Sequence, residues 1–261
     1  MKYGFIGTGN MGGALARAVA QKYADQVLLY DKAMEKAAAL AVETGAKAVD
    51  FAALVKESDY VFIGVKPYLV QQVLGEVKNA LQGNTPVIVS MAAGISVAEL
   101  SAMIDLPIIR ILPNTPVMVG AGLTLAVKNE KVTDAMTAAY LDAMALSGDT
   151  QWVDEKVFDG AGTVSSCGPA FAYMFMEALA DGGVYCGVPR DQAMLCAAQM
   201  LIGAGEMLKK SGMHPGALKD AVCSPGGSTI EGVRTLEENG FRFAATQAVI
   251  NAWKKMTGKM Q

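Results

Sequence analysis

The sequence has little of the chemistry that metal sites and thiol redox centres require. Its 261 residues include one histidine and four cysteines; no two cysteines form a C-x-x-C pair, and none clusters with the histidine. Zinc sites and redox motifs are usually built from such groupings. We therefore expect no metal centre and four reduced, mostly buried thiols.

Basic charge is also scarce. The chain carries 22 Lys and Arg residues against 25 Asp and Glu residues, which gives a formal net charge of -3 and a pI near 5.3. A surface that binds nucleic acid or an anionic membrane normally has an excess of Lys and Arg. We therefore expect a small-molecule partner, with no nucleic acid and no membrane.

Long apolar runs are missing, although 52% of the residues are hydrophobic and the mean hydropathy is +0.30. The longest stretch without a charge, residues 79–98, is interrupted by Asn79, Gln82, Asn84 and Pro86, which argues against a membrane span. The apolar run in the opening MKYGFIG is too short for a signal peptide. We expect a cytoplasmic protein with a sizeable core.

The first part of the chain alternates short β-branched runs with helical patterns. This alternation indicates βαβ units, and so an α/β fold with a doubly wound parallel sheet of the Rossmann type. The expected strands are residues 3–6, 27–30, 60–65, 87–90 and 108–112, with weaker ones at 123–127 and 151–153.

The strand pattern stops near Asp154, and the remainder is typical of helices. These are expected at residues 157–166, 169–186, 189–209, 215–222, 229–238 and 241–257. Pro169, Pro189 and Pro215 fit helix starts, where the missing N–H has no cost. We predict a dinucleotide-binding domain at 1–153 and an all-α dimerisation and substrate-binding domain at 154–261.

Two of the expected helices, residues 169–186 and 192–207, are apolar nearly all round. Such helices must be buried on every side, and a domain of about 107 residues offers too little interior to bury both in a monomer. We predict a homodimer with helices interleaved across a two-fold axis. The 16 methionines suit such an interface, although core filling explains any single one equally well.

The stretch GFIGTGNMGG contains G-x-G-x-x-G at Gly7, Gly9 and Gly12, after an expected strand and at the start of a helix. Asp31 ends the next strand, 19 positions after Gly12, where the ribose hydroxyls of a dinucleotide would lie. A glycine turn without a ligand is the alternative, but strand, spacing and acid together favour a dinucleotide site. Asp31 favours NAD, whereas Lys32 is able to neutralise the 2′-phosphate of NADP, so the preference between NADH and NADPH stays open.

Three further segments end expected strands: GVKP at 64–67, SMAAG at 90–94 and RILPNTP at 110–116. Ligands of an open parallel sheet lie at this edge. We predict Lys66 and Asn114 near the nicotinamide; ordinary turn chemistry is the alternative, and for Asn114 the two interpretations are equally good.

Acid catalysts are few in the second part. Residues 157–208 include neither lysine nor histidine, and His214 precedes Pro215 at an expected turn, where a structural or solvent-exposed histidine is the better interpretation than a catalytic one. Hydroxyacid dehydrogenases need such a group near the carbinol. A protonated iminium is already electrophilic, so the shortage favours an imine substrate.

A second glycine loop, CSPGGSTIEG at 223–232, opens an expected helix. Ser228 and Glu231 have capping-box spacing, which predicts Ser228 as the N-cap. Gly226 and Gly227 would present backbone N–H groups at the helix start, forming a site for the substrate carboxylate, and Thr229 would offer its hydroxyl to the imine nitrogen. A plain capped helix is the alternative.

The run HPGALKDAVCSPGGSTIEGVRTLE at 214–237 resembles the signature of the pyrroline-5-carboxylate reductase family. The resemblance extends through FIGTGNMGGAL, VKP, MAAGIS, R-x-L-PNTP and GPAF, and so covers essentially the whole chain. It implies a Rossmann domain, a helical dimerisation domain and dimers that assemble into larger rings such as decamers. It also implies hydride transfer from NADPH or NADH to the imine carbon of L-1-pyrroline-5-carboxylate, the last step of proline synthesis.

The resemblance also implies site residues. Those expected to contact the cofactor are Ile6, Gly7, Thr8, Gly9, Asn10, Met11, Gly64, Val65, Lys66, Pro67 and Ala93. Those expected to hold the substrate are Ser224, Gly227, Ser228 and Thr229. Because its hydroxyl is also expected to reach the imine nitrogen, Thr229 is the candidate catalytic residue.

Two alternatives remain. A β-hydroxyacid dehydrogenase or general imine reductase would have the same two-domain build, but the dehydrogenase should present a catalytic lysine in its helical domain. A dinucleotide-sensing dimer without turnover would have no use for the second glycine loop.

Overall fold

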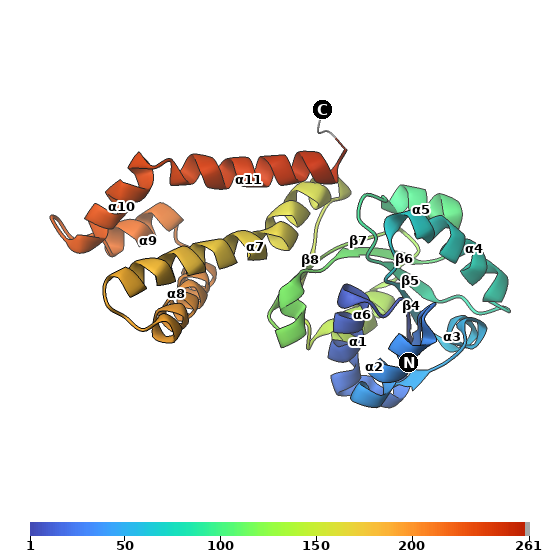
Figure 1. Ribbon diagram of the computed structural model, residues 1–261. Helices are drawn as coiled ribbons and strands as arrows, with labels where there is room; N and C mark the ends of the chain where they lie inside the picture. The colour runs from blue at the N-terminus through green and yellow to red at the C-terminus, as the bar shows by residue number, and fades with distance from the viewer. Residues whose placement is uncertain (259–261) are drawn as a thin grey trace. The chain divides into compact units, whose positions relative to one another are not determined.

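The computed structural model describes residues 1–258. Within them the chain forms two compact units (Figure 1). Unit 1 comprises residues 1–167 with the described end of the chain from Trp253, and unit 2 comprises residues 168–252. The predicted domain boundary after residue 153 falls just before a helix that continues from unit 1 into unit 2, and it stays a prediction.

Unit 1 is built on an eight-stranded sheet in the order β3-β2-β1-β4-β5-β6-β7-β8. The strands are β1 (Tyr3–Ile6), β2 (Val27–Tyr30), β3 (Lys47–Ala48), β4 (Tyr60–Ile63), β5 (Val87–Ser90), β6 (Ile108–Leu112), β7 (Gly122–Lys128) and β8 (Gly148–Trp152). All neighbouring pairs are parallel except β6 and β7, which are antiparallel. The predicted doubly wound parallel sheet is therefore confirmed, with β7 and β8 running antiparallel to the other six strands.

Helices lie on both faces of this sheet (Figure 1). They are α1 (Asn10–Tyr23), α2 (Met34–Thr44), α3 (Phe51–Glu57), α4 (Val70–Ala80), α5 (Val97–Met103) and α6 (Asp134–Met144), with short 3-10 turns η1 (Ala24–Gln26), η2 (Pro67–Leu69) and η3 (Thr115–Val119). Because each central strand is covered on both sides, its side chains alternate between two apolar clusters.

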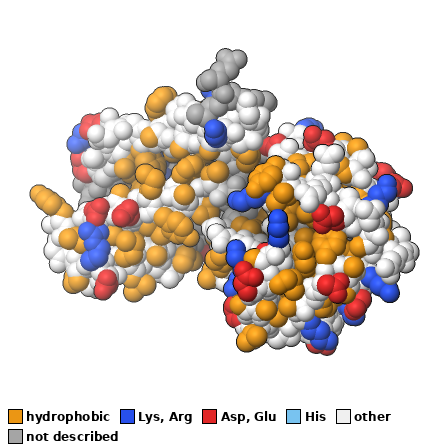
Figure 2. Space-filling model, turned by 45° about the vertical axis from the view of Figure 1, so that its right-hand side comes forward, with side chains coloured by type: hydrophobic (Ala, Val, Ile, Leu, Met, Phe, Trp, Pro, Cys, Tyr) orange, Lys and Arg blue, Asp and Glu red, His pale blue; other side chains and the backbone are white. Residues whose placement is uncertain are grey.

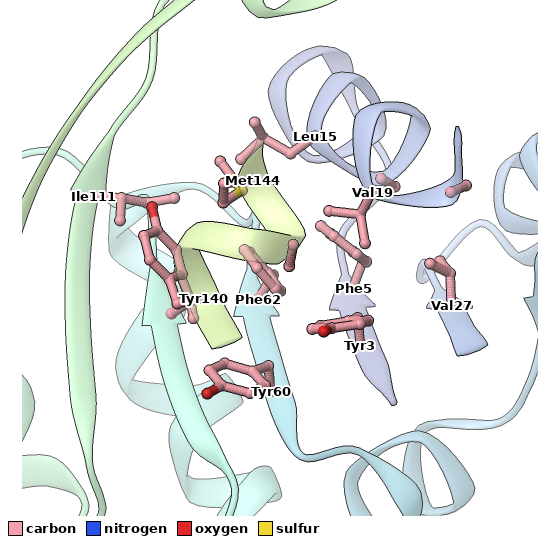
Figure 3. Packing of buried hydrophobic residues seen from close by; sticks show 14 of the residues in the cluster. Tyr3, Phe5, Leu15, Val19, Val27, Tyr60, Phe62, Ile111, Tyr140 and Met144 are labelled. Atoms are coloured by element: carbon pink, nitrogen blue, oxygen red, sulfur yellow. The ribbon is translucent and has the colours of Figure 1, made fainter. Parts of the chain in front are cut away.

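The two clusters divide the residues of single strands. Phe5 and Phe62 belong to the cluster beneath α1, α2 and α6, where their rings stack 4.4 Å apart (Figure 3). Ile63, the next residue along β4, belongs to the opposite cluster with Leu54 and Leu74 of α3 and α4. The core thus holds the carboxyl ends of the strands in one fixed row, which is where the site lies.

Unit 2 is entirely helical. Its helices are the second part of α7 (Glu155–Tyr185), α8 (Arg190–Ser211), α9 (Pro215–Ala221), α10 (Ser228–Glu238) and most of α11 (Phe241–Met256). Phe175 of α7 packs against Phe241 of α11 with ring centroids 5.4 Å apart, and α7 and α11 run side by side in Figure 1. The predicted all-α second part is confirmed.

Two sequence expectations about this part were wrong. Pro169 does not begin a helix; it lies inside the 31-residue α7, which replaces the two helices expected at 157–166 and 169–186. The cysteines are not mostly buried, since Cys186 and Cys196 are exposed in the single chain. By contrast, Pro215 is the first residue of α9 as expected, and Pro189 immediately precedes α8.

Over residues 1–258, no helix combines the length and the apolar character that crossing a membrane would require.

Candidate functional site

The first glycine loop is closely packed against the end of β4. A Cβ added at Gly12 would lie 2.1 Å from the carbonyl oxygen of Gly7, and one at Gly64 would lie 2.7 Å from the same oxygen. Gly7 has a φ of +94°, which L side chains rarely adopt, and its N–H donates to the Tyr30 carbonyl over 2.8 Å. These glycines are required by the protein itself.

Gly9 differs from its neighbours. It precedes the first residue of α1 with a φ of -66°, and a Cβ added there would meet no atom within 4 Å. Nothing in the described chain explains the absence of a side chain, whereas close approach of a ligand does. The first turn of α1 has neither an acidic residue nor a side-chain cap, so its N–H groups remain available to an anion. The loop therefore fits the pyrophosphate of a dinucleotide.

A cleft of about 420 Å³ opens at this edge of the sheet. It is lined by Gly9, Asn10, Met11, Gly64, Val65, Lys66, Pro67, Met91, Ala92 and Ala93. Three separate predicted segments therefore meet in one cleft, at the carboxyl ends of β1, β4 and β5. Sequence reasoning missed Met91 and Ala92, although they belong to the SMAAG segment that ends β5.

Asp31 lies at the end of β2 and is held by the first loop. Its Oδ2 accepts from the Thr8 N–H at 2.8 Å and from the Thr8 hydroxyl at 3.1 Å, and its Oδ1 accepts from the Ala33 N–H at 3.0 Å. Partial burial alone would raise the pKa of Asp31, but these hydrogen bonds and nearby Lys36 outweigh burial and hold the pKa below its ordinary value. Asp31 is thus a fixed anion whose remaining acceptor capacity lies mainly on Oδ1.

Asn114 and Ile6 are placed differently from the residues that line the cleft. The Asn114 amide binds backbone on both sides: Oδ1 accepts from the Leu123 N–H at 2.9 Å, and Nδ2 donates to the Ser165 carbonyl at 3.1 Å. Ile6 is buried, and its carbonyl accepts from the Gly64 N–H. The predicted contacts of both residues with the cofactor stay predictions, as does that of exposed Lys32.

The second glycine loop is a tight turn on the surface of unit 2. The Gly227 N–H donates to the Ser224 carbonyl at 3.0 Å, and Gly226 has a φ of +66°. A Cβ added at Gly227 would lie 2.4 Å from the Ser224 hydroxyl oxygen. Ser224, Gly226, Ser228 and Thr229 are exposed in the single chain.

The capping box expected in this loop is absent. Gly227, not Ser228, is the N-cap of α10, and no side chain caps that helix. Glu231, which should have completed the box, instead accepts from Arg234 at 3.2 Å. The turn that ends at Gly227 starts the helix one residue earlier than expected. Ser228 and Thr229 are therefore the first two helical residues, and their hydroxyls are not used as caps.

The single histidine has the structural role expected of it. His214 is the N-cap of α9, and its Nδ1 accepts from the Gly216 N–H at 3.1 Å. A capping box does occur in the chain, but at Ser96 and Glu99, where the sequence interpretation did not look for one.

Sequence reasoning also missed Arg110. Its buried side chain projects from β6 and forms ion pairs with Glu155 at 2.5 Å and Asp159 at 2.7 Å. The RILPNTP segment was noted for Asn114 alone; the signal for Arg110 is a charged residue inside an otherwise apolar strand.

A doubly wound sheet with a glycine-lined cleft at its carboxyl edge defines the class of protein, an NAD(P)-dependent oxidoreductase. Comparison with protein families agrees with this class. Residues 2–94 match the family model described as NADP oxidoreductase coenzyme F420-dependent, and residues 155–258 match the model for pyrroline-5-carboxylate reductase dimerisation.

Individual relatives identify the family within this class. The chain is 41% identical to pyrroline-5-carboxylate reductase of Escherichia coli over 97% of this chain and 96% of that one. The corresponding protein of Treponema pallidum is 39% identical over 95% and 97% of the two chains. The solved structure of Plasmodium falciparum pyrroline carboxylate reductase with NADP bound is 30% identical, with a TM-score of 0.87 over 99% of this chain and 97% of that one.

The chain belongs to the pyrroline-5-carboxylate reductase family. It is an NAD(P)-dependent oxidoreductase with the reductase activity for which that family is named.

Proposed function

We propose that the chain transfers a hydride from NAD(P)H to the imine carbon of L-1-pyrroline-5-carboxylate and releases L-proline, as the last step of proline synthesis. The observation that carries this proposal is the presence of two separate glycine loops, each followed by a helix whose first turn has no side-chain cap. One forms a cleft that fits a dinucleotide, and the other exposes hydroxyl and N–H groups at the start of α10.

The cofactor side of the proposal uses the cleft. Backbone N–H groups of Gly9, Asn10 and Met11 would hold the pyrophosphate at the start of α1. Residues 64–67 and Ala93 would line the remainder of the cleft around the cofactor. When bound, NAD(P)H supplies the hydride. The chain's own side chains and backbone bind and orient both the cofactor and the substrate.

The substrate side uses the second loop. The Ser228 N–H, at the first position of α10, would donate to the substrate carboxylate, with the Ser224 hydroxyl beside it, whereas the Gly227 N–H already donates to the Ser224 carbonyl. The Thr229 hydroxyl would bind the imine nitrogen. Because no capping bond occupies the side chains of Ser228 and Thr229, both are available for this purpose.

The chemistry needs little acid from the protein. The iminium carbon is electrophilic before it binds, so holding it close to the hydride donor provides much of the acceleration. Water is the simplest proton donor for the product amine, and Thr229 orients the nitrogen without itself having to ionise.

Asp31 leads us to propose NADH as the preferred cofactor. Its ionised carboxylate is fixed by Thr8 and Ala33 at the end of β2, where it would accept from a ribose hydroxyl and repel a 2′-phosphate. Lys32 acts in the opposite direction, but among residues 1–258 its exposed side chain has no ion-pair partner, and we expect its attraction to be screened by water and salt.

The helical part is suited to self-association. Of the 22 residues of α8, only Ala193 and Ala197 are buried in the single chain, while Leu195 and Ile202 are 68% and 59% exposed. Hydrophobic side chains gather over the helical part in Figure 2. An apolar hollow of about 590 Å³ lies between α8 and α9, lined by Leu201, Ala204, Gly205, Met207, Leu208, Pro215, Leu218, Lys219 and Val222.

Surfaces of this kind indicate a partner, and the match to a dimerisation model supports a second copy of the chain. The proposal therefore includes a homodimer with interleaved helices and its further assembly into rings such as decamers. As a separate point, we propose a cytoplasmic location. Light scattering distinguishes the assemblies, and a stable, active monomer would refute the dimer.

The direct test is to follow oxidation of NADH and NADPH side by side with pyrroline-5-carboxylate as acceptor. We expect proline formation with both and a higher kcat/KM with NADH. Titration of cofactor-loaded protein with proline tests the second loop separately. Turnover with neither cofactor would overturn the proposed activity, while failure of proline to bind would remove the second loop from it.

A further inference from the structure

Strand β6 and the loop after it contact successive turns of α7. The first contact is Arg110, whose guanidinium pairs with Glu155 and Asp159 and lies 4.1 Å from the centre of the Phe158 ring. This anchors the first turn of α7 to the strand. It also leaves the buried Arg110 Nε without a partner among the described residues, so Arg110 itself is not optimally satisfied.

The next two contacts with α7 are made by Leu112 and Asn114, the second and fourth residues after Arg110. A Cβ added at Gly162 would lie 2.2 Å from Leu112 Cδ2, so α7 passes the end of β6 at very close range. Two residues beyond Leu112, the Asn114 Nδ2 donates to the Ser165 carbonyl. Residues on one face of a strand recur at every second position, and successive turns of a helix recur every three to four residues. Arg110, Leu112 and Asn114 therefore meet successive turns of α7, the last of them at Ser165.

The contact at Ser165 coincides with a defect in the helix. In a regular α-helix, the Ser165 carbonyl would accept from the N–H of the residue four positions later. That residue is Pro169, which has no N–H and lies inside α7. The Asn114 amide therefore supplies the Ser165 carbonyl with a donor where the helix cannot.

The orientation of the Asn114 amide is determined by its two partners. Oδ1 faces the Leu123 N–H, and Nδ2 faces the Ser165 carbonyl. Turning the amide over would place oxygen against oxygen and N–H against N–H. The side chain thus links β7 to the interrupted turn of α7 in one way only.

We propose that Asn114 is a positioning residue for hydride transfer, acting through α7. It compensates for Pro169 and thereby determines how α7 continues beyond the proline. Helix α7 is one of two covalent connections between unit 1, which has the cofactor cleft, and unit 2, which has the second glycine loop; the other lies within α11. The hydrogen-bond half of this inference, that Asn114 compensates for Pro169, stands by itself, whereas the positioning half, that Asn114 affects hydride transfer, rests on the proposed function.

The hydrogen-bond half is tested by a double-mutant cycle of Asn114→Ala and Pro169→Ala, read by thermal unfolding. Leaving the Ser165 carbonyl without a donor should lower Tm by about 4 °C in the Pro169 protein. With Pro169→Ala, the new N–H supplies that carbonyl, so the same Asn114→Ala change should lower Tm by about half as much, the remainder being the lost contact with the Leu123 N–H. Equal losses in both backgrounds would overturn the compensation.

Asn129 provides a matched control. Its Oδ1 accepts from the Ile108 N–H at 3.0 Å and its Nδ2 donates to the Leu106 carbonyl at 3.0 Å, so it makes the same two kinds of bond away from α7. Asn129→Ala should lower Tm equally in both backgrounds. Should Asn114→Ala fail to fold, Asn114→Asp retains the acceptor for Leu123, loses the donor to Ser165, and enters the same cycle.

The positioning half is tested by the division between kcat and cofactor affinity. Asn114→Ala should lower kcat about tenfold, with the Kd for NADH, measured by fluorescence titration, unchanged within twofold. A weaker affinity for NADH would instead indicate the direct cofactor contact predicted from the sequence and would overturn action through α7. Asn129→Ala should leave kcat close to that of the unchanged protein at a temperature where both variants are folded. Equal kcat in the two variants would reduce Asn114 to a stability contact and overturn the positioning role. If the unchanged protein does not reduce pyrroline-5-carboxylate, the proposed function fails, while the thermal cycle still decides the hydrogen-bond half.

Discussion

The two glycine loops of this protein are alike in sequence but unlike in their surroundings. The first is complete in a single chain: Gly7, Gly12 and Gly64 pack against one another, and Asp31 fixes Thr8. The second is a solvent-exposed turn in which only Gly226 and Gly227 are restricted by the chain itself. The first loop is therefore built by the core beneath it, whereas the second has few supports of its own.

The difference explains how the two loops can divide one reaction. NAD(P)H gives up its hydride once in each turnover and is then exchanged, so the first loop must rebind the cofactor repeatedly, and the buried parallel strands hold the loop in one geometry for this purpose. The second loop belongs to a part with unburied apolar helices, so its surroundings in the assembled protein include surfaces absent from the single chain. We expect substrate binding to depend on association more strongly than cofactor binding does.

The largest effect is expected at Gly9, where we infer that the lack of a side chain is needed for cofactor binding and not for folding. Gly9→Ala adds a methyl group where the described chain has open space, so Tm should be unchanged. The methyl group should keep the pyrophosphate from the N–H groups of α1 and weaken NADH affinity roughly hundredfold. Isothermal titration measures the affinity.

Gly75→Ala is the control for this change, since Gly75 lies in α4 and a Cβ there also meets open space. It should leave NADH affinity as it was. Unchanged affinity in Gly9→Ala would mean that the first loop does not hold the cofactor.

The next effect tests the second loop. Thr229→Val removes the hydroxyl proposed to bind the imine nitrogen and should lower kcat/KM for pyrroline-5-carboxylate about tenfold to hundredfold, the range for one hydrogen bond to a charged group. NADH affinity should stay within twofold. Steady-state kinetics and titration measure the two quantities.

Thr235→Val, on the same helix, is the matched variant, because the Thr235 hydroxyl donates only to the Glu231 carbonyl within α10. It should retain full turnover. Equal turnover in the two variants would remove Thr229 from the reaction.

A smaller effect is expected at the ribose end of the first loop. Asp31→Ser removes the fixed charge and should change the ratio of kcat/KM for NADH to that for NADPH by about tenfold in favour of NADPH. Lys32→Ala should change the ratio in the opposite direction. If the ratio is the same in Asp31→Ser as in the unchanged protein, another group distinguishes the two cofactors.

The smallest effect concerns acid stability. The pKa of Asp31 is below its ordinary value of 3.8, so its ionised form stabilises the fold above that value, and the contribution is lost as pH falls through the folded pKa. Unfolding by urea at pH 7, 5 and 3 should show Asp31→Asn less stable than the unchanged protein by about 0.5 kcal/mol at pH 7. The difference should shrink below about pH 4.

Asp25→Asn removes an exposed carboxylate outside the cleft and is the control for that experiment. A difference between Asp31→Asn and the unchanged protein that grows toward pH 3 would contradict the assigned role of the Thr8 and Ala33 hydrogen bonds.

Much of the first part of the molecule was predictable from sequence because its signals are local. Strand β1, the glycines after it and Asp31 lie within 31 residues, and each has a fixed distance from the next in a βαβ unit. Convergence of 64–67 and Ala93 on the same cleft followed from the rule that ligands lie at the carboxyl edge. The short edge strand β3 was missed because two residues carry no periodic pattern.

The errors in the helical part have one cause. Pro169 was expected to begin a helix and Ser228 to cap one, since both are common at those positions. Each position was instead decided by distant partners or by the preceding turn: the Asn114 amide compensates for the proline inside α7, and the turn that ends at Gly227 moves the start of α10. Neither contact has a signal in the local sequence.

By itself, the sequence determined the two parts of the chain, the dinucleotide loop with its acidic partner, the apolar helices and the family. These depend on spacing along the chain and on the side-chain period of each element, which residues carry with them into any fold. The tertiary structure alone decided which of the glycines serve the protein and which serve a ligand, where Arg110 finds its carboxylates, and why Asn114 faces Ser165. Those contacts join residues that are far apart in sequence, such as Asn114 and Ser165, and such residues come together only when the chain has folded.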